Sequence, residues 1–237
     1  MTGVMTLYQT SIGKKVVMAV TGAILLGFVF VHMFGNLKIY GGPAALNEYA
    51  EQLRYLGKPI FGYEQLLWIA RVVLLGSVIL HITSAVQLTL QSNGSRPQPY
   101  NVNTRTQPAY RYASYTMRWG GVVLFLFIVF HLLHFTFGAV GYSSGQFVNP
   151  HGGVYEVYNN VVYGFMNPIV SIFYIAAMIA LGLHIYHGTW SMFQTLGISS
   201  EKTSGMLRSF AAALALVIAL GNISIPIAVL TGILQLG

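Results

Sequence analysis

The chain has 237 residues, of which 55% are hydrophobic and only 7% are charged. A soluble domain usually carries about 25% charged residues, so twelve Lys plus Arg and five Asp plus Glu are too few to cover a water-soluble surface. The net charge of +7 could suggest nucleic acid, but a mean hydropathy of +0.64 and scattered basic residues argue against it. The chain has no cysteine, which excludes disulfides, thiolate-bound clusters and cysteine nucleophiles within it.

Five stretches are long and apolar enough to cross a membrane, since a spanning helix needs about 20 largely apolar residues. We predict these spans at 16–37, 65–90, 119–141, 168–192 and 207–234. Asn167 followed by Pro168 is typical of a helix start, with Asn as the cap and Pro in the first helical position. The sequence therefore predicts an all-α integral membrane protein with five transmembrane helices in one domain, 1–237, without an internal repeat.

The basic residues predict the orientation of these spans. With the N-terminus inside, eight basic residues lie on the inner side and four on the outer side, which favours a cytoplasmic N-terminus and an outer C-terminus. The inner set is Lys14, Lys15, Arg96, Arg105, Arg111, Arg118, Lys202 and Arg208, and the outer set is Lys38, Arg54, Lys58 and Arg71. The first span has no small-residue cleavage site, so we expect it to be retained rather than removed as a signal peptide.

Histidine is the polar residue that stands out in the spans. Six of the seven histidines lie in predicted spans or at their ends, and only His151 lies in a loop; the six are His32, His81, His131, His134, His184 and His187. A polar side chain in hydrocarbon must find a partner, and an ionisable one there is a functional candidate. One such histidine could simply bond a neighbouring helix. Four spans that each carry one favour a shared binding role.

The depths of these histidines predict two pairs. With a rise of about 1.5 Å per residue, His32 and His131 lie roughly 20–24 Å from the inner edge of their outward-running spans. On the inward-running spans, His81 and His184 lie roughly 23–26 Å from the outer edge, close to the inner face. Two imidazoles at one depth match six-coordinate haem iron. No C-x-x-C-H sequence is present, so such haem would be b-type.

Two histidines remain ambiguous at this level. His134 follows His131 by three residues, and His187 follows His184 by three, so each lies on nearly the same helix face as a proposed ligand. Depth alone does not choose between His131 and His134. His187 falls at the inner edge. For both His134 and His187 a polar or quinone-side role is the main interpretation, and ligation of iron is the alternative.

Four segments resemble a known family. They are FVFVHMFGNLKIYGGPAALNEYAEQLR at 28–54, VILHITSAVQL at 78–88, RWGGVVLFLFIVFH at 118–131 and LGLHIYHGTWSMFQTLGI at 181–198. Together they resemble the cytochrome b membrane-anchor subunit of succinate:quinone oxidoreductases, in its single-subunit, five-helix, two-haem form. The most specific match is His184, three residues, Gly188 and then Trp190-Ser191. An arginine thirteen residues before the third histidine also matches, which favours His131 over His134.

The resemblance implies a place in an enzyme complex, succinate dehydrogenase or fumarate reductase, in a prokaryotic cytoplasmic membrane. A flavoprotein subunit with FAD and an iron–sulfur subunit would be its partners. This chain would relay electrons to a quinone, most simply menaquinone, through two b haems. The family pattern assigns the iron ligands to His32 with His131 on the outer side and to His81 with His184 on the inner side. No dicarboxylate site is expected in this chain.

Further roles follow from the resemblance. Arg118 is expected to bind a haem propionate, whereas positive-inside topology suffices for Lys14, Lys15, Arg105 and Arg111. Glu64 could transfer a quinone proton as an acid/base group, or be a solvated interfacial carboxylate. Tyr63, Arg54 and Arg71 are candidate neighbours of an outer quinone or of the outer propionates.

Three alternatives stay open on the sequence. The chain could be a dihaem anchor of another quinone-linked dehydrogenase, of the formate dehydrogenase or hydrogenase type. It could be a histidine-lined metal transporter. It could also be a haem-free structural anchor whose histidines are packing residues.

Overall fold

Five long helices dominate the fold. A computed structural model describes residues 8–95, 108–150 and 154–237, with side chains in the middle range from Met117 onwards. Within these ranges, the helices long and apolar enough to cross a membrane are α2 (Ser11–Asn36), α4 (Gln65–Gly94), α5 (Pro108–His131), α7 (Pro168–Thr195) and α8 (Ser204–Leu230). The predicted all-α fold with five apolar spans is confirmed, and the chain is on that basis a multi-pass membrane protein.

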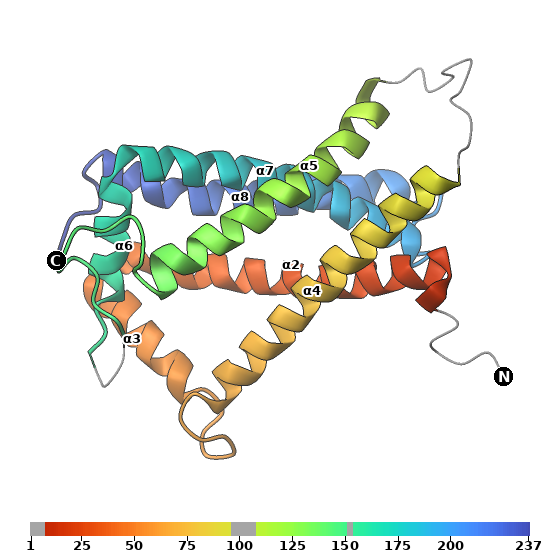
Figure 1. The fold of residues 1–237 in the computed structure, drawn as a ribbon. Helices are drawn as coiled ribbons and strands as arrows, with labels where there is room; N and C mark the ends of the chain where they lie inside the picture. The colour runs from red at the N-terminus through yellow and green to blue at the C-terminus, as the bar shows by residue number, and fades with distance from the viewer. Residues whose placement is uncertain (1–7, 96–107, 151–153) are drawn as a thin grey trace.

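The long helices form a bundle with two distinct ends. Helices α2, α7 and α8 run lengthwise against one another, α4 packs on α2, and α5 packs on α7. Figure 1 shows α4 and α5 crossing the others obliquely, with the start of α2 and the C-terminal residue Gly237 at opposite ends. We call these the N-terminal end and the C-terminal end of the bundle. The opposite ends agree with an odd number of spans.

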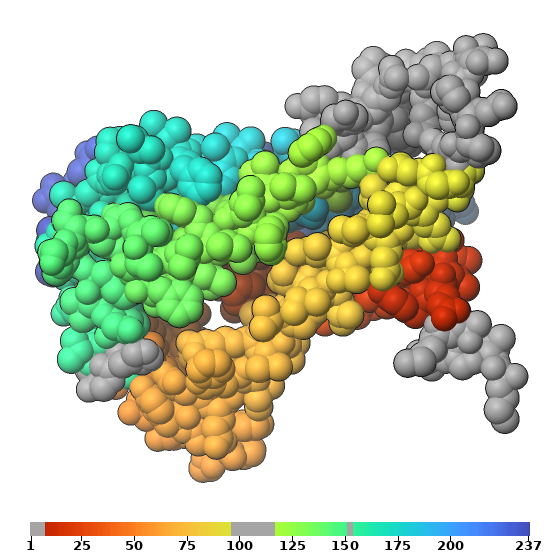
Figure 2. Space-filling model, viewed as in Figure 1, coloured from red at the N-terminus to blue at the C-terminus, as the bar shows by residue number. Residues whose placement is uncertain are grey.

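Helix α4 shows most clearly why this bundle suits a membrane. Its buried residues are the small polar Ser77 and Ser84, whereas its large apolar side chains face outward, with Val72 66% and Leu75 62% exposed. Figure 2 shows this helix and α5 lying over one face of the molecule. In water such a surface would drive association, whereas in a bilayer lipid chains cover it.

Two short helices lie at the C-terminal end, in stretches predicted only as breaks between spans (Figure 1). After the turn η1 (Leu37–Gly41), helix α3 covers Gly42–Tyr55, and helix α6 covers Val157–Met166. Helix α3 buries Leu46, Ala50 and Arg54, which recur every four residues along one face. This spacing explains why a stretch with several charges is helical.

The third and fifth spans end earlier than predicted. Helix α5 stops at His131, continues as a π-helical turn, η2 (Leu132–Thr136), and leaves the helix before the predicted end at residue 141. Helix α8 ends at Leu230 rather than at 234. Apolar residues continue past both helix ends, but only Leu234 among them is buried in the core, whereas Phe137 is 66% and Ile233 73% exposed. The predicted start of α7 is confirmed, since the Asn167 side chain accepts a hydrogen bond of 3.0 Å from the backbone N–H of Ile169.

Candidate functional site

His81 is held on α4 by the neighbouring helix α2. Its Nδ1 lies 3.1 Å from the backbone oxygen of Met18 and 3.2 Å from Oγ1 of Thr21. A carbonyl oxygen only accepts hydrogen bonds, so Nδ1 carries the proton and donates it. In a neutral imidazole, Nε2 then keeps a free lone pair, which is the tautomer that a metal ligand needs. Gly22 allows α2 to approach His81 closely, since a Cβ on Gly22 would lie only 3.3 Å from Cε1 of His81.

His184 faces His81 from α7. The two ring centres are 6.4 Å apart, and the ring planes make an angle of 61°. A Cβ on Gly121 of α5 would lie 4.0 Å from Cε1 of His184. The Nδ1 of His184 is buried and has no hydrogen-bond partner among the described residues. The two histidines that were paired by depth thus lie next to each other, with their rings in an edge-to-face arrangement.

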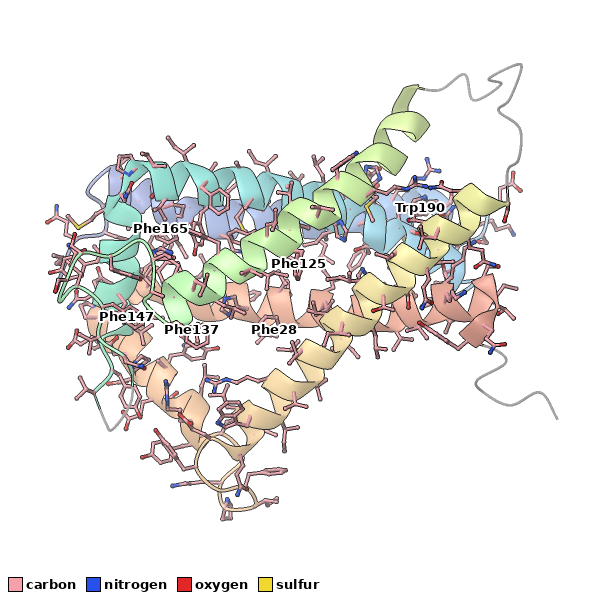
Figure 3. All side chains as sticks on the ribbon, in the orientation of Figure 1. Phe28, Phe125, Phe137, Phe147, Phe165 and Trp190 are labelled. Atoms are coloured by element: carbon pink, nitrogen blue, oxygen red, sulfur yellow. The ribbon has the colours of Figure 1, made fainter. Side chains whose placement is uncertain are left out.

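His32 of α2 and His131 of α5 form the second approach. Their ring centres are 6.0 Å apart and their planes are nearly perpendicular, at 88°. Each ring has a neighbour that orients it. Phe28 stacks on His32 with centres 5.2 Å apart and an angle of 20°, and Figure 3 labels Phe28 on α2. The hydroxyl of Tyr174 lies 3.4 Å from Nδ1 of His131.

Both ring separations suit two imidazoles that share one metal ion. A ligating imidazole nitrogen lies about 2 Å from a transition metal and the ring centre about 1 Å further, so two ligands on opposite sides of the ion have centres about 6 Å apart. The observed 6.0 and 6.4 Å agree with this value. Rings in direct edge-to-face contact have centres about 4.5–7 Å apart, so the same separations also fit two imidazoles packed against each other.

The helices that carry each pair leave space between their backbones. In the described part of the chain, α2 pairs closely with α4 and α5 with α7, but neither α2 with α5 nor α4 with α7 is a closely packed pair. The facing imidazoles therefore bridge helices that stand apart. Met18 and Thr21, which contact His81, precede His32 on α2 by 14 and 11 residues, so the two pairs lie about 17–21 Å apart along that helix. Each of two levels of the bundle thus carries one pair of imidazoles.

His134 and His187 take no part in either pair. His134 is fully buried on η2, where its Nδ1 bonds the Tyr174 hydroxyl at 2.9 Å. His187 is half-buried on α7, with its ring 4.9 Å from that of Tyr186. Among the described residues, no three His, Cys, Asp or Glu side chains gather as a metal-binding group. His151 lies outside the described residues.

No family model, curated protein or solved structure matches this chain.

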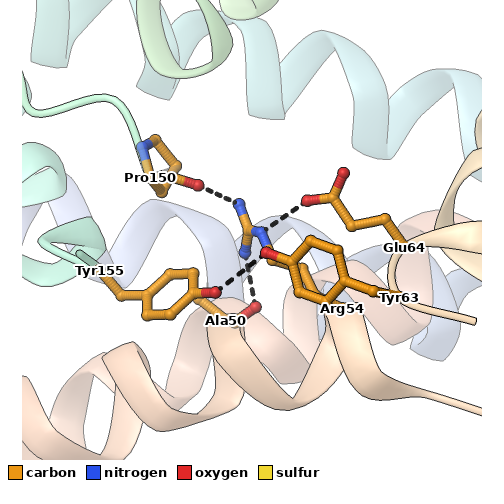
Figure 4. Close-up of polar contacts among 6 residues, drawn as sticks. All are labelled: Ala50, Arg54, Tyr63, Glu64, Pro150 and Tyr155. Carbon is orange, nitrogen blue, oxygen red and sulfur yellow. Dashed lines mark hydrogen bonds and ion pairs between the residues drawn. The ribbon is translucent and has the colours of Figure 1, made fainter. Parts of the chain in front are cut away.

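The residues predicted for a quinone site are partly brought together. Arg54 is buried, and its Nε lies 3.0 Å from Oε1 of Glu64 (Figure 4). The same guanidinium donates to the backbone oxygens of Ala50 at 2.6 Å and Pro150 at 2.9 Å. In addition, the backbone N–H of Glu64 donates to the backbone oxygen of Arg54 at 2.7 Å. Arg54 thus links α3, the start of α4 and the loop before α6.

Two phenols complete this polar cluster. The hydroxyls of Tyr63 and Tyr155 lie 3.2 Å apart, and the Arg54 guanidinium lies over the Tyr155 ring at 4.9 Å (Figure 4). The hydrogen bond between the two hydroxyls raises the pKa of Tyr155 to about 12, so Tyr155 is neutral at physiological pH. Arg71 is not part of the cluster: its guanidinium lies over the ring of Trp68 at 4.7 Å.

Several residues that shape the site were not predicted from the sequence. Met18 and Thr21 orient His81, Phe28 orients His32, and Tyr174 bonds His131. Tyr174 could have been identified from the sequence, because it is a hydroxyl-bearing residue in an apolar span at nearly the depth of His131. Met18 contributes only its backbone oxygen, so its side chain carried no signal.

Proposed function

We propose that this chain is a dihaem cytochrome b that anchors a succinate:quinone oxidoreductase in a prokaryotic cytoplasmic membrane, with its N-terminus inside and its C-terminus outside. The observation that carries the proposal is the pair of imidazole approaches at 6.0 and 6.4 Å. The proposal also rests on the sequence segments that resemble this family.

The residues present fit two haem b groups. His32 with His131 would hold one, and His81 with His184 the other. When bound, a haem with two histidine ligands accepts and donates single electrons. The chain's own contribution is to present Nε2 of two of these imidazoles. It does so at His81 through the Nδ1 donation to Met18, and at His131 through the contact with Tyr174.

Basic side chains at the N-terminal end fit the propionates and the partner subunits. Arg118 is exposed on α5, one turn before Gly121, which lies beside His184. Its cation would therefore meet the carboxylates of the haem held by His81 and His184.

Lys14 and Arg208 also lie at this end, and the Arg208 guanidinium lies over the ring of Trp190 at 4.5 Å. Figure 3 labels Trp190 on α7. Arg105 lies outside the described residues and the side chain of Arg111 is not described. The iron–sulfur subunit, bound in turn to the FAD-carrying flavoprotein, would dock here.

The cluster of Arg54, Tyr63, Glu64 and Tyr155 is the candidate region for menaquinone or another quinone at the opposite end. Its carboxylate and phenols offer groups that exchange protons with a quinone. Arg71, on the first turns of α4, adds a cation near the same end of the bundle.

The test of the proposal is an optical spectrum with haem quantitation of the purified protein. We expect two haem b per chain with the spectrum of bis-imidazole iron, and copurified flavoprotein and iron–sulfur subunits. Protein without haem would overturn the proposal in favour of a structural anchor or a transporter. Two haems with the subunits of a formate dehydrogenase or hydrogenase would identify a different complex.

Orientation has a separate test. A periplasmically active reporter fused after Gly237 should be active, and the same reporter fused ahead of α2 should be inactive. The reverse pattern contradicts the proposed topology but leaves the haem assignment intact.

Gly22→Val should reduce haem content to about one per chain. A Cβ at position 22 would already lie 3.3 Å from Cε1 of His81, so the larger branched side chain must displace that ring. A displaced His81 no longer binds iron, and the haem that it would hold with His184 is lost. Gly205→Val at the start of α8 is the matched control, because a Cβ there would meet no atom within 4 Å from any other described part of the chain. Equal haem content in the two variants would contradict the role of this close approach.

A further inference from the structure

One phenol connects two histidines at the C-terminal end of the bundle. The Tyr174 hydroxyl lies 2.9 Å from Nδ1 of His134 and 3.4 Å from Nδ1 of His131. His134 is three residues after His131, but the π-helical turn η2 gives it a different direction. Single π-helical turns occur frequently at functional sites. The result is a chain of polar atoms, His131–Tyr174–His134, inside an apolar core.

The packing around His134 leaves it one usable nitrogen. A Cβ on Gly141 or Gly164 would lie 2.7 or 2.8 Å from its Nε2, so the backbone closes over that side of the ring. The ring also packs on Phe135, with centres 4.1 Å apart, and on Tyr142 at 4.9 Å. Nε2 has no hydrogen-bond partner among the described residues. The tightly packed His134 ring therefore makes its hydrogen bond through Nδ1, to the Tyr174 hydroxyl.

The proton positions along this chain follow from the ligand role of His131. If its Nε2 binds iron, the neutral ring carries its proton on Nδ1 and donates it to the Tyr174 oxygen. The phenol has one proton, which it then donates to Nδ1 of His134. The opposite direction would place the His131 proton on Nε2 and block ligation. His134 then accepts the phenol proton at Nδ1 and carries its own proton on Nε2, a buried N–H without a partner among the described residues.

We propose that Tyr174 and His134 are positioning residues that set the tautomer and ring plane of His131. The inference rests on the proposed binding of haem by His32 and His131. Phe28 fixes the plane of His32 by stacking, and Tyr174 fixes the plane of His131 by its hydrogen bond. The two together hold the ligand planes at 88°. The pair also adjusts the haem potential, because an acceptor for Nδ1–H makes the imidazole a stronger donor to ferric iron.

Tyr174→Phe tests the inference without relying on turnover. Loss of the hydroxyl removes the acceptor at Nδ1, so the midpoint potential of the haem held by His32 and His131 should rise while the other haem is unchanged. The ring of His131 becomes free to rotate, so the strongly anisotropic EPR signal that perpendicular ligand planes give should change in shape. His134→Phe, which removes the acceptor for the phenol, should shift the potential in the same direction. His134→Gln, which keeps an acceptor, should restore part of the shift.

Tyr158→Phe is the matched control. Its hydroxyl donates to the backbone oxygen of Gln235 at 3.0 Å in the same core, so this variant should keep the wild-type potentials and EPR signal. The inference is overturned if Tyr174→Phe and His134→Phe retain two haems with wild-type potentials and spectra. Absence of haem from the wild-type protein instead overturns the proposed function, so the two failures are distinct.

Discussion

His131→Ala is expected to remove one of the two haems, whereas His134→Gln should leave both in place. The reason is the direction of the two rings. His131 faces His32 with ring centres 6.0 Å apart, while Nε2 of His134 is closed in by Gly141 and Gly164. The measurement is haem per chain by the pyridine haemochrome spectrum after purification in detergent.

His187→Gln is a suitable companion, since it changes the other histidine that lies three residues after a proposed ligand. Both glutamine variants should retain two haems. If His134→Gln loses a haem and His131→Ala keeps both, the ligand assignment of the His32–His131 pair is wrong.

Arg54→Ala should be the most destabilising substitution in the polar cluster, with a loss of about 2–3 kcal/mol in the free energy of unfolding. The buried guanidinium donates to Glu64, Ala50 and Pro150, and its removal breaks all three hydrogen bonds. Glu64→Gln keeps an oxygen acceptor for Arg54, so this variant should lower the free energy of unfolding by only about 1 kcal/mol. Thermal unfolding in detergent, at matched protein concentration, measures both.

Arg71→Ala is the control, because Arg71 is exposed and its guanidinium lies over the ring of Trp68 at 4.7 Å. Arg71→Ala should lower the free energy of unfolding by less than about 1 kcal/mol.

The same set of variants separates the two roles of Glu64. If Glu64 transfers a quinone proton, Glu64→Gln abolishes quinone turnover while stability and haem content stay near wild type. Wild-type turnover in Glu64→Gln would restrict Glu64 to holding Arg54.

The pairing of histidines across the bundle was predictable because depth depends on local properties. The length of each apolar run and the helix rise place a residue along the membrane normal, and this was sufficient to match His32 with His131 and His81 with His184. The rings of both pairs face each other in the structure. Their binding of iron stays a prediction.

The choice between His131 and His134 was not predictable in the same way. Both lie at similar depth on one side of a regular helix, and the structure separates them by a π-helical turn. Such a turn depends on what packs around it, here Gly141 from the following loop and Gly164 from α6. The polar cluster around Arg54 is similar, because one of its acceptors is the backbone oxygen of Pro150, 96 residues away.

By itself, the sequence determined a five-span, all-helical membrane protein with histidines at two depths, since hydropathy and helix rise act on contiguous residues. It also predicted the start of α7 from Asn167 and Pro168. Only the tertiary structure decided which way each histidine turns and which group holds it. Rotation of a helix about its axis, a carbonyl such as that of Met18, and a phenol such as Tyr174 come from neighbours distant in sequence, and their effect depends on packing that no local pattern encodes.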